Sequence, residues 1–349
     1  MKCTIKDIAA ELGLSRNTVS KALKHNPEVS KRTQDIVLKK AIEMGYTAAD
    51  VTDTTAIVTQ EIGNKRSSGA ILFLTRAHSY ESEFWPSVLR GIETVLSQNG
   101  FQLIFANMTD LELANGTLPK TVLTTNIAGI IAVEICHNRI WHHLLSLDVP
   151  IVTVDAPKDY LNLLGKVDII MMENKLNTYK IIDSLIKKGA RSFSFVGDLY
   201  SPNVGIGFQE RFDALTESLA QHGLIRNDTC SITSETSDTI NNSTVLSDYI
   251  SNMPQLPDVF FCGNDWNAIQ MIYSLQSLGY KVPEDVRVVG FDNIPISEKI
   301  IPALTTIDTP KTYLGELAAQ RIVARISRPE IPCIFTKVST KLIVRESTR

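Results

Sequence analysis

Apolar residues recur three and four positions apart in the first 46 residues, which predicts three short helices. Residues 4–23, TIKDIAAELGLSRNTVSKAL, contain two of these patterns, and Gly13 lies between them, where a sharp turn needs backbone freedom. Thr4 and Ser15 can cap these two helices, and Ser30 can cap a third. Two helices joined by a short turn are typical of a helix–turn–helix, which places its second helix in the major groove of DNA.

The polar positions of the second helix predict where this motif would touch DNA. Arg16, Asn17 and Lys21 lie outward from its apolar face, and Thr18 and Ser20 fit backbone anchors or caps. Arginine can pair with guanine, and asparagine with adenine, through two hydrogen bonds each. For each residue the alternative is a phosphate contact without base specificity, and for the whole stretch it is a helical pair with no DNA role. The expected DNA-binding residues are Thr4, Ser15, Arg16, Asn17, Thr18, Ser20 and Lys21.

Strand-length apolar runs alternate with amphipathic helices from Gly69 onward. Near-continuous apolar runs are typical of parallel strands buried on both faces, and strand–helix alternation implies doubly wound sheets. The runs form two series, which predicts two similar α/β subdomains with a ligand cleft outside the carboxyl ends of their strands. The first series is 69–74, 101–106, 127–133 and 150–155, and the second is 167–172, 192–197, 258–263 and 286–291.

The predicted fold is therefore an all-α helix–turn–helix head followed by two doubly wound parallel-sheet subdomains. We expect the head at residues 1–46, a linker at 47–68, where periodicity is lost, and an effector-binding and dimerisation domain at 69–349. Within that domain the expected boundaries are about 69–160 and 294–320 for the N-lobe, and about 161–293 and 321–345 for the C-lobe.

Charge is distributed unevenly between these parts. Residues 1–46 hold nine Lys or Arg and five Asp or Glu, a balance of +4, whereas the whole chain carries −3, so residues 47–349 carry −7. A basic head on an acidic body confines attraction for phosphate to the head. This balance excludes a uniformly basic nucleic-acid coat and a strongly basic membrane-surface protein.

Composition and motifs narrow the function classes further. No apolar run approaches the ~20 residues of a membrane span, and the amino-terminal residues have no signal-peptide core. Five scattered cysteines without a CxxC motif suggest free thiols in a reducing cytoplasm. His137, His142 and His143 fit no zinc spacing and are expected at the surface. With no nucleophile elbow or dinucleotide fingerprint, we expect no catalytic residues, cofactor or metal.

Several motifs in order resemble the lactose/galactose repressor family (LacI/GalR). The head segment 4–23 and VSKRTQDIVLKKAIEMGY, which follows it, look like that family's DNA-binding domain. ENKLNTYKIIDSLIKKGARSFSFVGD and FCGNDWNAIQMIYSLQSLGYKVPEDVRVVGFDN resemble its second lobe, and PALTTIDTPKTYLGELAAQRI resembles the segment after it. The resemblance implies a homodimer on a pseudo-palindromic double-stranded operator, with an effector domain like a periplasmic binding protein.

The resemblance also implies effector contacts at Trp85, Arg211 and Asp265, and more weakly at Asn293. Trp266 is a second aromatic candidate. Aromatic faces pack on sugars and charged groups hold their hydroxyls, so we expect a sugar, although a purine would also stack on Trp85. Each position has a structural alternative: a core tryptophan, a surface ion pair for Arg211, and a helix cap for Asp265.

The linker departs from the family pattern. Tyr46 matches, but Ala48 stands in place of a proline, and Asp53 and Thr55 stand where the family has an arginine and a leucine that wedges into the minor groove. An acidic side chain beside phosphate is unfavourable and threonine is a poor wedge. Ile57 or Val58 is an alternative wedge in a shifted helix.

These observations predict a cytoplasmic transcription regulator, a repressor, whose affinity for its operator is controlled by a small molecule between two lobes. The alternatives are a regulator responsive to a purine or another metabolite, and a sugar-binding protein that binds no DNA. An enzyme with the same α/β sheets is the remaining alternative, and the sequence contains no motif for it.

Overall fold

The computed structural model describes residues 4–23, 26, 29–44, 69–76, 83–201, 204–233 and 239–349. The chain divides into two compact units, Met1–Ser67 and Ser68–Arg349, which we describe separately. The predicted linker at 47–68, with Asp53, Thr55, Ile57 and Val58, lies outside the described residues, and so do Tyr46 and Ala48.

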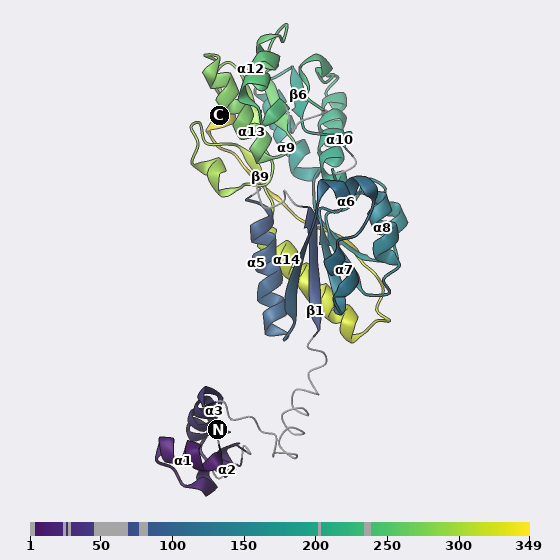
Figure 1. Ribbon diagram of the computed structural model, residues 1–349. Coiled ribbons are helices and arrows are strands. Elements are labelled where there is room, and N and C mark those ends of the chain that lie inside the picture. Colours follow the sequence, from purple (N-terminus) through teal and green to yellow (C-terminus); the bar gives the residue numbers. More distant parts are fainter. Residues whose placement is uncertain are drawn as a thin grey trace. The chain divides into compact units, whose positions relative to one another are not determined.

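The first unit contains three helices around a small apolar core: α1 (Ile5–Leu12), α2 (Arg16–Leu23) and α3 (Lys31–Glu43) (Figure 1). Thr4 begins α1, because its backbone N–H and its hydroxyl both donate to the Asp7 carboxylate, at 2.8 and 2.7 Å. Gly13 ends α1 in the left-handed conformation (φ 62°), as the turn requires. The buried core consists of Ile8, Ala9, Val19, Ala22, Val37 and Ala41.

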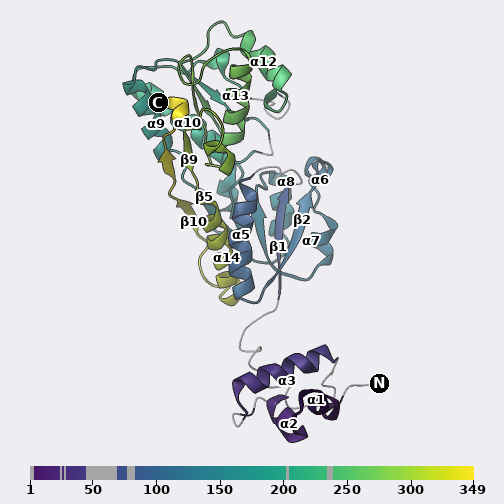
Figure 2. The same ribbon diagram turned by 90° about the vertical axis from the view of Figure 1, so that its left-hand side faces the viewer.

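The N-lobe of the second unit is built on a six-stranded parallel sheet of order β10-β5-β4-β3-β1-β2. Helices α5 and α14 cover one face, and α6, α7 and α8 lie on the other (Figure 2). The strands are β1 (Ala70–Arg76), β2 (Gln102–Met108), β3 (Ile127–Val133), β4 (Ile151–Val154), β5 (Asp168–Met172) and β10 (Phe335–Val338). The helices are α5 (Trp85–Gln98), α6 (Asp110–Asn115), α7 (Lys120–Thr124), α8 (Asn138–Leu145) and α14 (Lys311–Ser327).

The C-lobe has a three-stranded parallel sheet of order β6-β7-β8, with helices on both faces. An antiparallel pair, β9 and β11, lies beside it. The strands are β6 (Phe193–Val196), β7 (Val259–Cys262), β8 (Arg287–Val289), β9 (Thr306–Asp308) and β11 (Lys341–Ile343). The helices are α9 (Leu176–Lys187), α10 (Ile206–Gln221), α12 (Ser243–Ser251) and α13 (Asp265–Ser277), and short 3-10 turns lie at Tyr160–Leu163, Asp228–Cys230, Pro295–Glu298 and Glu346–Thr348.

All eight predicted strands form, but part of the predicted lobe division is wrong because the chain crosses between the lobes three times. Residues 168–172 pair with β4 and β10 in the N-lobe sheet, not in the C-lobe. Residues 294–308 lie in the C-lobe, where Leu304 joins the buried core and β9 pairs with β11. Residues 321–338 return to the N-lobe through α14 and β10. An apolar strand buried on both faces reads the same in either sheet, so its pattern does not assign it to a lobe.

No helix in the described ranges of the second unit or the head is long and apolar enough to cross a lipid bilayer.

The N-lobe helices α5 and α14 approach each other through two glycines. A Cβ atom at Gly91 would lie 2.0 Å from the Thr312 carbonyl oxygen, and one at Gly315 would lie 1.9 Å from that of Val88. We expect Gly315→Ala to lower the free energy of unfolding by about 1–3 kcal/mol, because the helices must move apart. Denaturant unfolding measures this, with Glu93→Ala on the exposed face of α5 as control; equal stabilities for the two variants would contradict the close packing.

Candidate functional site

The start of α2 separates helix-capping residues from residues that face outward. The Thr18 N–H donates to Ser15 Oγ at 3.0 Å, and the two hydroxyls lie 2.8 Å apart. Ser15 and Thr18 therefore complete the helix start, as Thr4 does for α1. Arg16 and Asn17 are exposed in the first turn, and Ser20 and Lys21 are partly exposed. The first turn of this helix thus presents one guanidinium and one amide group to solvent, the groups that read base edges.

In the second unit, carboxylates follow three strands whose carboxyl ends meet at the junction of the lobes. Glu134 directly follows β3, Asp155 directly follows β4, and Asp292 lies shortly after β8. All three have positive φ angles, of 57°, 68° and 113°. Such backbone costs about 1–3 kcal/mol per non-glycine residue and is concentrated at binding sites. The fold therefore holds these acids at one edge at an energetic cost.

A buried arginine lies near two of these acids, Asp155 and Asp292, whereas Glu134 pairs with Arg76 at 2.5 Å. Arg211, on α10, is only 4 % exposed and donates Nε to Asn174 Oδ1 at 2.9 Å and Nη1 to the Gly263 carbonyl at 2.5 Å. Its Nη2 lies 3.8 Å from Asp292 Oδ1. The guanidinium carbon lies 3.6 Å from the centre of the Phe291 ring. These contacts fix the guanidinium in one position between the lobes.

The electrostatics of this cluster place its titration near neutral pH. Burial raises the pKa of Asp155 to about 6 and that of Asp292 to about 7, while the positive charge of Arg211 acts in the opposite direction on both. Burial also lowers the pKa of Arg211. Among the described residues no N–H or O–H donates to the Asp292 carboxylate, whose Oδ1 lies 3.8 Å from Arg211 Nη2, close enough for charge attraction but not for a hydrogen bond; Lys311 Nζ donates to the Asp292 backbone carbonyl instead. The cluster can therefore accept hydrogen bonds from a small polar molecule.

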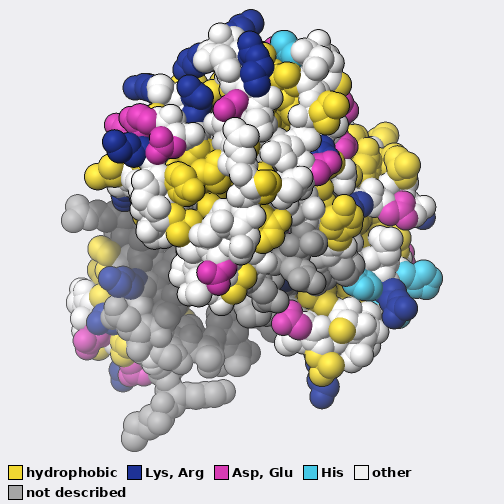
Figure 3. Space-filling model, turned by 90° about the horizontal axis from the view of Figure 1, so that it is seen from above, with side chains coloured by type: hydrophobic (Ala, Val, Ile, Leu, Met, Phe, Trp, Pro, Cys, Tyr) yellow, Lys and Arg dark blue, Asp and Glu magenta, His cyan; other side chains and the backbone are white. Residues whose placement is uncertain are grey.

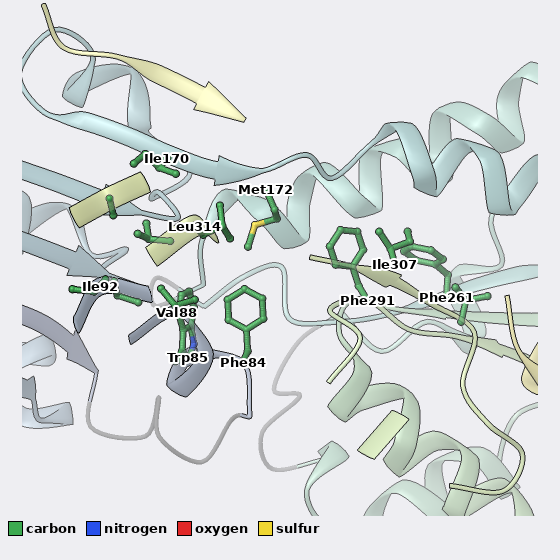
Figure 4. Close-up of a cluster of buried hydrophobic side chains, with 14 of the residues drawn as sticks. Phe84, Trp85, Val88, Ile92, Ile170, Met172, Phe261, Phe291, Ile307 and Leu314 are labelled. Atoms are coloured by element: carbon green, nitrogen blue, oxygen red, sulfur yellow. The ribbon is translucent and has the colours of Figure 1, made fainter. Parts of the chain in front are cut away.

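Trp85 begins α5 and is nearly buried, at 9 % exposed. Its ring meets the Phe84 ring edge-on, with centres 4.6 Å apart. Both belong to the apolar cluster that also contains Phe291 and Ile307 of the other lobe (Figure 4). The same cluster thus holds Trp85 and the ring on which Arg211 lies.

Asp265 has a structural role in these contacts. Its Oδ2 accepts from the Ile294 N–H at 2.9 Å and the Ser297 hydroxyl at 2.5 Å, and its Oδ1 accepts from the Thr306 hydroxyl at 2.5 Å. The cap of α13 is Asn264 instead. Asp265 therefore ties the chain after β8 to α13, and we do not assign it as a direct effector contact.

Asn293 and Trp266 are likewise engaged elsewhere. The Asn293 amide donates to Asp308 at 3.0 Å and accepts from Arg345 at 2.9 Å. Trp266 is 46 % exposed, and its indole N–H donates to Asn241 at 2.7 Å. The residue that faces Arg211 is Asp292, one position before Asn293.

The sequence reasoning missed Glu134, Asp155, Asn174 and Asp292. A usable signal was present for two of them, since IAGIIAVE and PIVTVD each end an apolar strand in one carboxylate, and carboxyl ends of parallel strands meet at one edge. Asn174 carries no such signal, because its role depends on the crossover after β5. No group of His, Cys, Asp and Glu that could hold a metal is found among the described residues, and His142 and His143 are exposed.

Comparisons with known proteins bear on both units of the chain. The family model described as "Bacterial regulatory proteins, lacI family" matches residues 4–49, and that of a "Periplasmic binding protein-like domain" matches residues 182–348. A Bacillus subtilis (strain 168) protein named "Probable HTH-type transcriptional repressor ExuR" is 24% identical, covering 99% of this chain and 98% of its own. The ribose operon repressor of Halalkalibacterium halodurans is 23% identical, covering 99% and 97%.

Solved structures share the fold. A complex of the transcriptional regulator CelR with cellobiose has a TM-score of 0.68 at 23% identity, covering 99% of this chain and 100% of that one. A lac repressor dimer bound to operator and an anti-inducer has a TM-score of 0.69 at 19% identity, covering 100% and 99%. Over its whole length the chain is therefore similar to regulatory proteins of the lacI family, whose named members are DNA-binding transcription repressors.

The buried acids should make stability depend on pH. A carboxylate whose pKa is raised on folding stabilises the folded state at low pH, and this contribution is lost as pH rises through the raised value. Each such group removes up to about 1.4 kcal/mol per pH unit between its ordinary pKa and its raised one. We expect the melting temperature of the second unit to fall between about pH 4 and pH 7, with a smaller slope in Asp292→Asn.

Thermal melts across that pH range give the slope of melting temperature against pH. This slope tests the prediction even if the variant differs from the wild type in absolute stability. Asp148→Asn is the control, because Asp148 is exposed and also has a positive φ of 50°. Identical slopes for the wild type and Asp292→Asn would contradict the raised pKa.

Proposed function

We propose that this protein is a cytoplasmic transcription repressor. We propose further that its effector is a sugar, a small molecule with several hydroxyl groups, held between Asp155, Arg211 and Asp292. The observation that carries the proposal is the set of strained acids around a fixed, buried guanidinium. Carboxylates accept from sugar hydroxyls and a guanidinium donates to them, so this set suits a ligand whose every substituent is both donor and acceptor.

A sugar is favoured over a purine by the composition of the site. The aromatic rings that lie against Arg211 are Phe291 and Phe208, whose centres are 3.6 and 5.5 Å from the guanidinium carbon, so the face of Phe291 under Arg211 is unavailable for stacking. Among structural neighbours, CelR is complexed with cellobiose and a regulator from Enterococcus faecalis with ribose. The purine alternative remains an outcome of the test below.

We further propose that the chain acts as a homodimer on a pseudo-palindromic operator. Aromatic and apolar side chains are exposed on two C-lobe helices, and Figure 3 shows hydrophobic side chains gathered on the end of the molecule that the C-lobe forms. The four on α12 and α13 are Val245, Tyr249, Trp266 and Tyr273. A second copy would bury this surface, and effector binding would shift the dimer between states of different operator affinity.

The effector site is tested by a thermal-shift screen of neutral sugars, sugar acids and nucleobases on the full chain. We expect a sugar to raise the melting temperature, and Asp155→Asn to reduce that rise because a hydrogen-bond acceptor is lost. The loss of affinity should be about 10-fold or more, as expected for one hydrogen bond to a charged group. Asp148→Asn is the matched control and should respond like the wild type.

If only nucleobases raised the melting temperature, the effector would be a purine and the sugar hypothesis would be wrong. An equal response in Asp155→Asn and wild type would remove Asp155 from the site.

The DNA interface is tested by fluorescence anisotropy with fragments from upstream of the chain's own coding region. We expect Arg16→Ala and Asn17→Ala each to weaken specific binding by about 1–3 kcal/mol and to relax specificity at one base pair. Lys21→Ala should weaken binding to all sequences and lower the salt dependence by about one phosphate contact.

Lys39→Ala, an exposed lysine on α3, serves as the control for a lost charge. If Arg16→Ala and Asn17→Ala weakened binding to random DNA as much as to the operator fragment, both residues would be phosphate contacts only.

A further inference from the structure

The two lobes touch at a point beside the proposed effector site, where the start of α10 meets the chain after β4. The Ile206 N–H, from the C-lobe, donates to the Ala156 carbonyl of the N-lobe at 2.9 Å. The Ile206 side chain packs against the N-lobe core that contains Ala156. The first turn of α10 is therefore docked on the opposite lobe by both a hydrogen bond and apolar contact.

A lysine adds a second connection across the same junction. Lys158 Nζ, from the N-lobe, donates to the Leu199 carbonyl and lies 3.5 Å from the Ser201 carbonyl, both in the loop after β6. Two of the three ammonium donors thus go to the C-lobe backbone, and the alkyl stem spans the junction.

Gly205 makes this approach possible. A Cβ atom at this position would lie 2.4 Å from Asp155 Oδ2 and 3.0 Å from the Ala156 carbonyl oxygen. Its φ of −72° is open to any residue, so what requires glycine here is the neighbouring lobe and not the backbone conformation. Gly207, two residues on, differs: a Cβ there would meet nothing closer than 3.7 Å.

We propose that these contacts form a latch, made of Ala156 and Lys158 on one lobe and Leu199, Gly205 and Ile206 on the other, that holds the effector cleft closed. The latch lies between two effector-site groups, because Gly205 abuts the Asp155 carboxylate and α10 carries Arg211. The latch therefore sets the distance between Asp155 of the N-lobe and Arg211 of the C-lobe. This last step rests on the proposed function; the latch itself does not.

A thiol beside the latch reports whether it is closed. Cys136 is 6 % exposed and lines a cavity of about 380 Å³ together with Lys158, Tyr200, Ser201 and Val204. This cavity is open to solvent on one side, and parting of the lobes would remove its three C-lobe residues and expose the Cys136 thiol further to a reagent. Cys262, in β7, is fully buried within the C-lobe and serves as an internal reference for unfolding.

The experiment measures iodoacetamide modification of Cys136 and Cys262 in the full chain by peptide mass spectrometry, with no effector added. We expect Gly205→Ala and Lys158→Met each to speed modification of Cys136 by about tenfold, as expected for the loss of one or two hydrogen bonds, and to leave Cys262 slow. The matched controls are Gly207→Ala and Lys166→Met, which should behave like the wild type.

Modification of Cys136 within about twofold of wild type in both latch variants would overturn the proposal. So would an equal acceleration in Gly207→Ala, or a parallel acceleration at Cys262, which would mean unfolding in place of lobe opening. If Gly205→Ala does not fold, Lys158→Met decides alone, since it removes hydrogen bonds without adding a clash. A failed sugar screen would leave these rates unchanged, so the two proposals fail separately.

Discussion

The position of the buried Arg211 guanidinium is the constraint on which the junction of the lobes depends. A charge taken out of water must be surrounded by acceptors, and this one has the Asn174 side chain, the Gly263 carbonyl and the Asp292 carboxylate around it. These partners come from the crossover after β5, the end of β7 and the chain after β8. One side chain therefore fixes three segments that lie far apart in the sequence.

The raised pKa values of the acids follow from the same constraint. One guanidinium cannot fully compensate Asp155 and Asp292 in a buried site, so burial dominates and both carboxyl groups hold their protons to higher pH. The left-handed backbone at these positions adds strain that the surrounding sheets must offset. A ligand that donates hydrogen bonds to the acids would relieve the unfavourable burial, which gives it a physical reason to bind there.

The sequence predicted the fold well, and the predicted effector residues stay a prediction. Helix and strand positions follow from local apolar periodicity, so the three helices of the head were predicted, and so were eight of the eleven strands in the part of the chain that the structure describes. The three missed strands, β9, β10 and β11, lie beside the crossovers, where pairing depends on distant partners. The same reason explains the wrong lobe boundaries. The sequence analysis selected Asn293, whereas the side chain that lies near Arg211 is that of Asp292. Which of two neighbouring side chains faces Arg211 depends on the positive φ angles at these residues, and the sequence pattern does not predict those angles.

Asp265 and Asp292 show how a structural acid differs from one available to a ligand. Both carboxyl groups lie near Arg211; Asp265 is fully buried and the Asp292 side chain is 13 % exposed, and desolvation raises the pKa of each. Asp265 accepts three hydrogen bonds from the protein, so its desolvation is compensated within the fold and a ligand would have to replace existing bonds. The Asp292 carboxylate accepts none from the described residues, so a donor supplied from outside adds a bond without breaking one. The free acceptor capacity of the Asp292 carboxylate, rather than its pKa, therefore supports the proposal that Asp292 faces the effector.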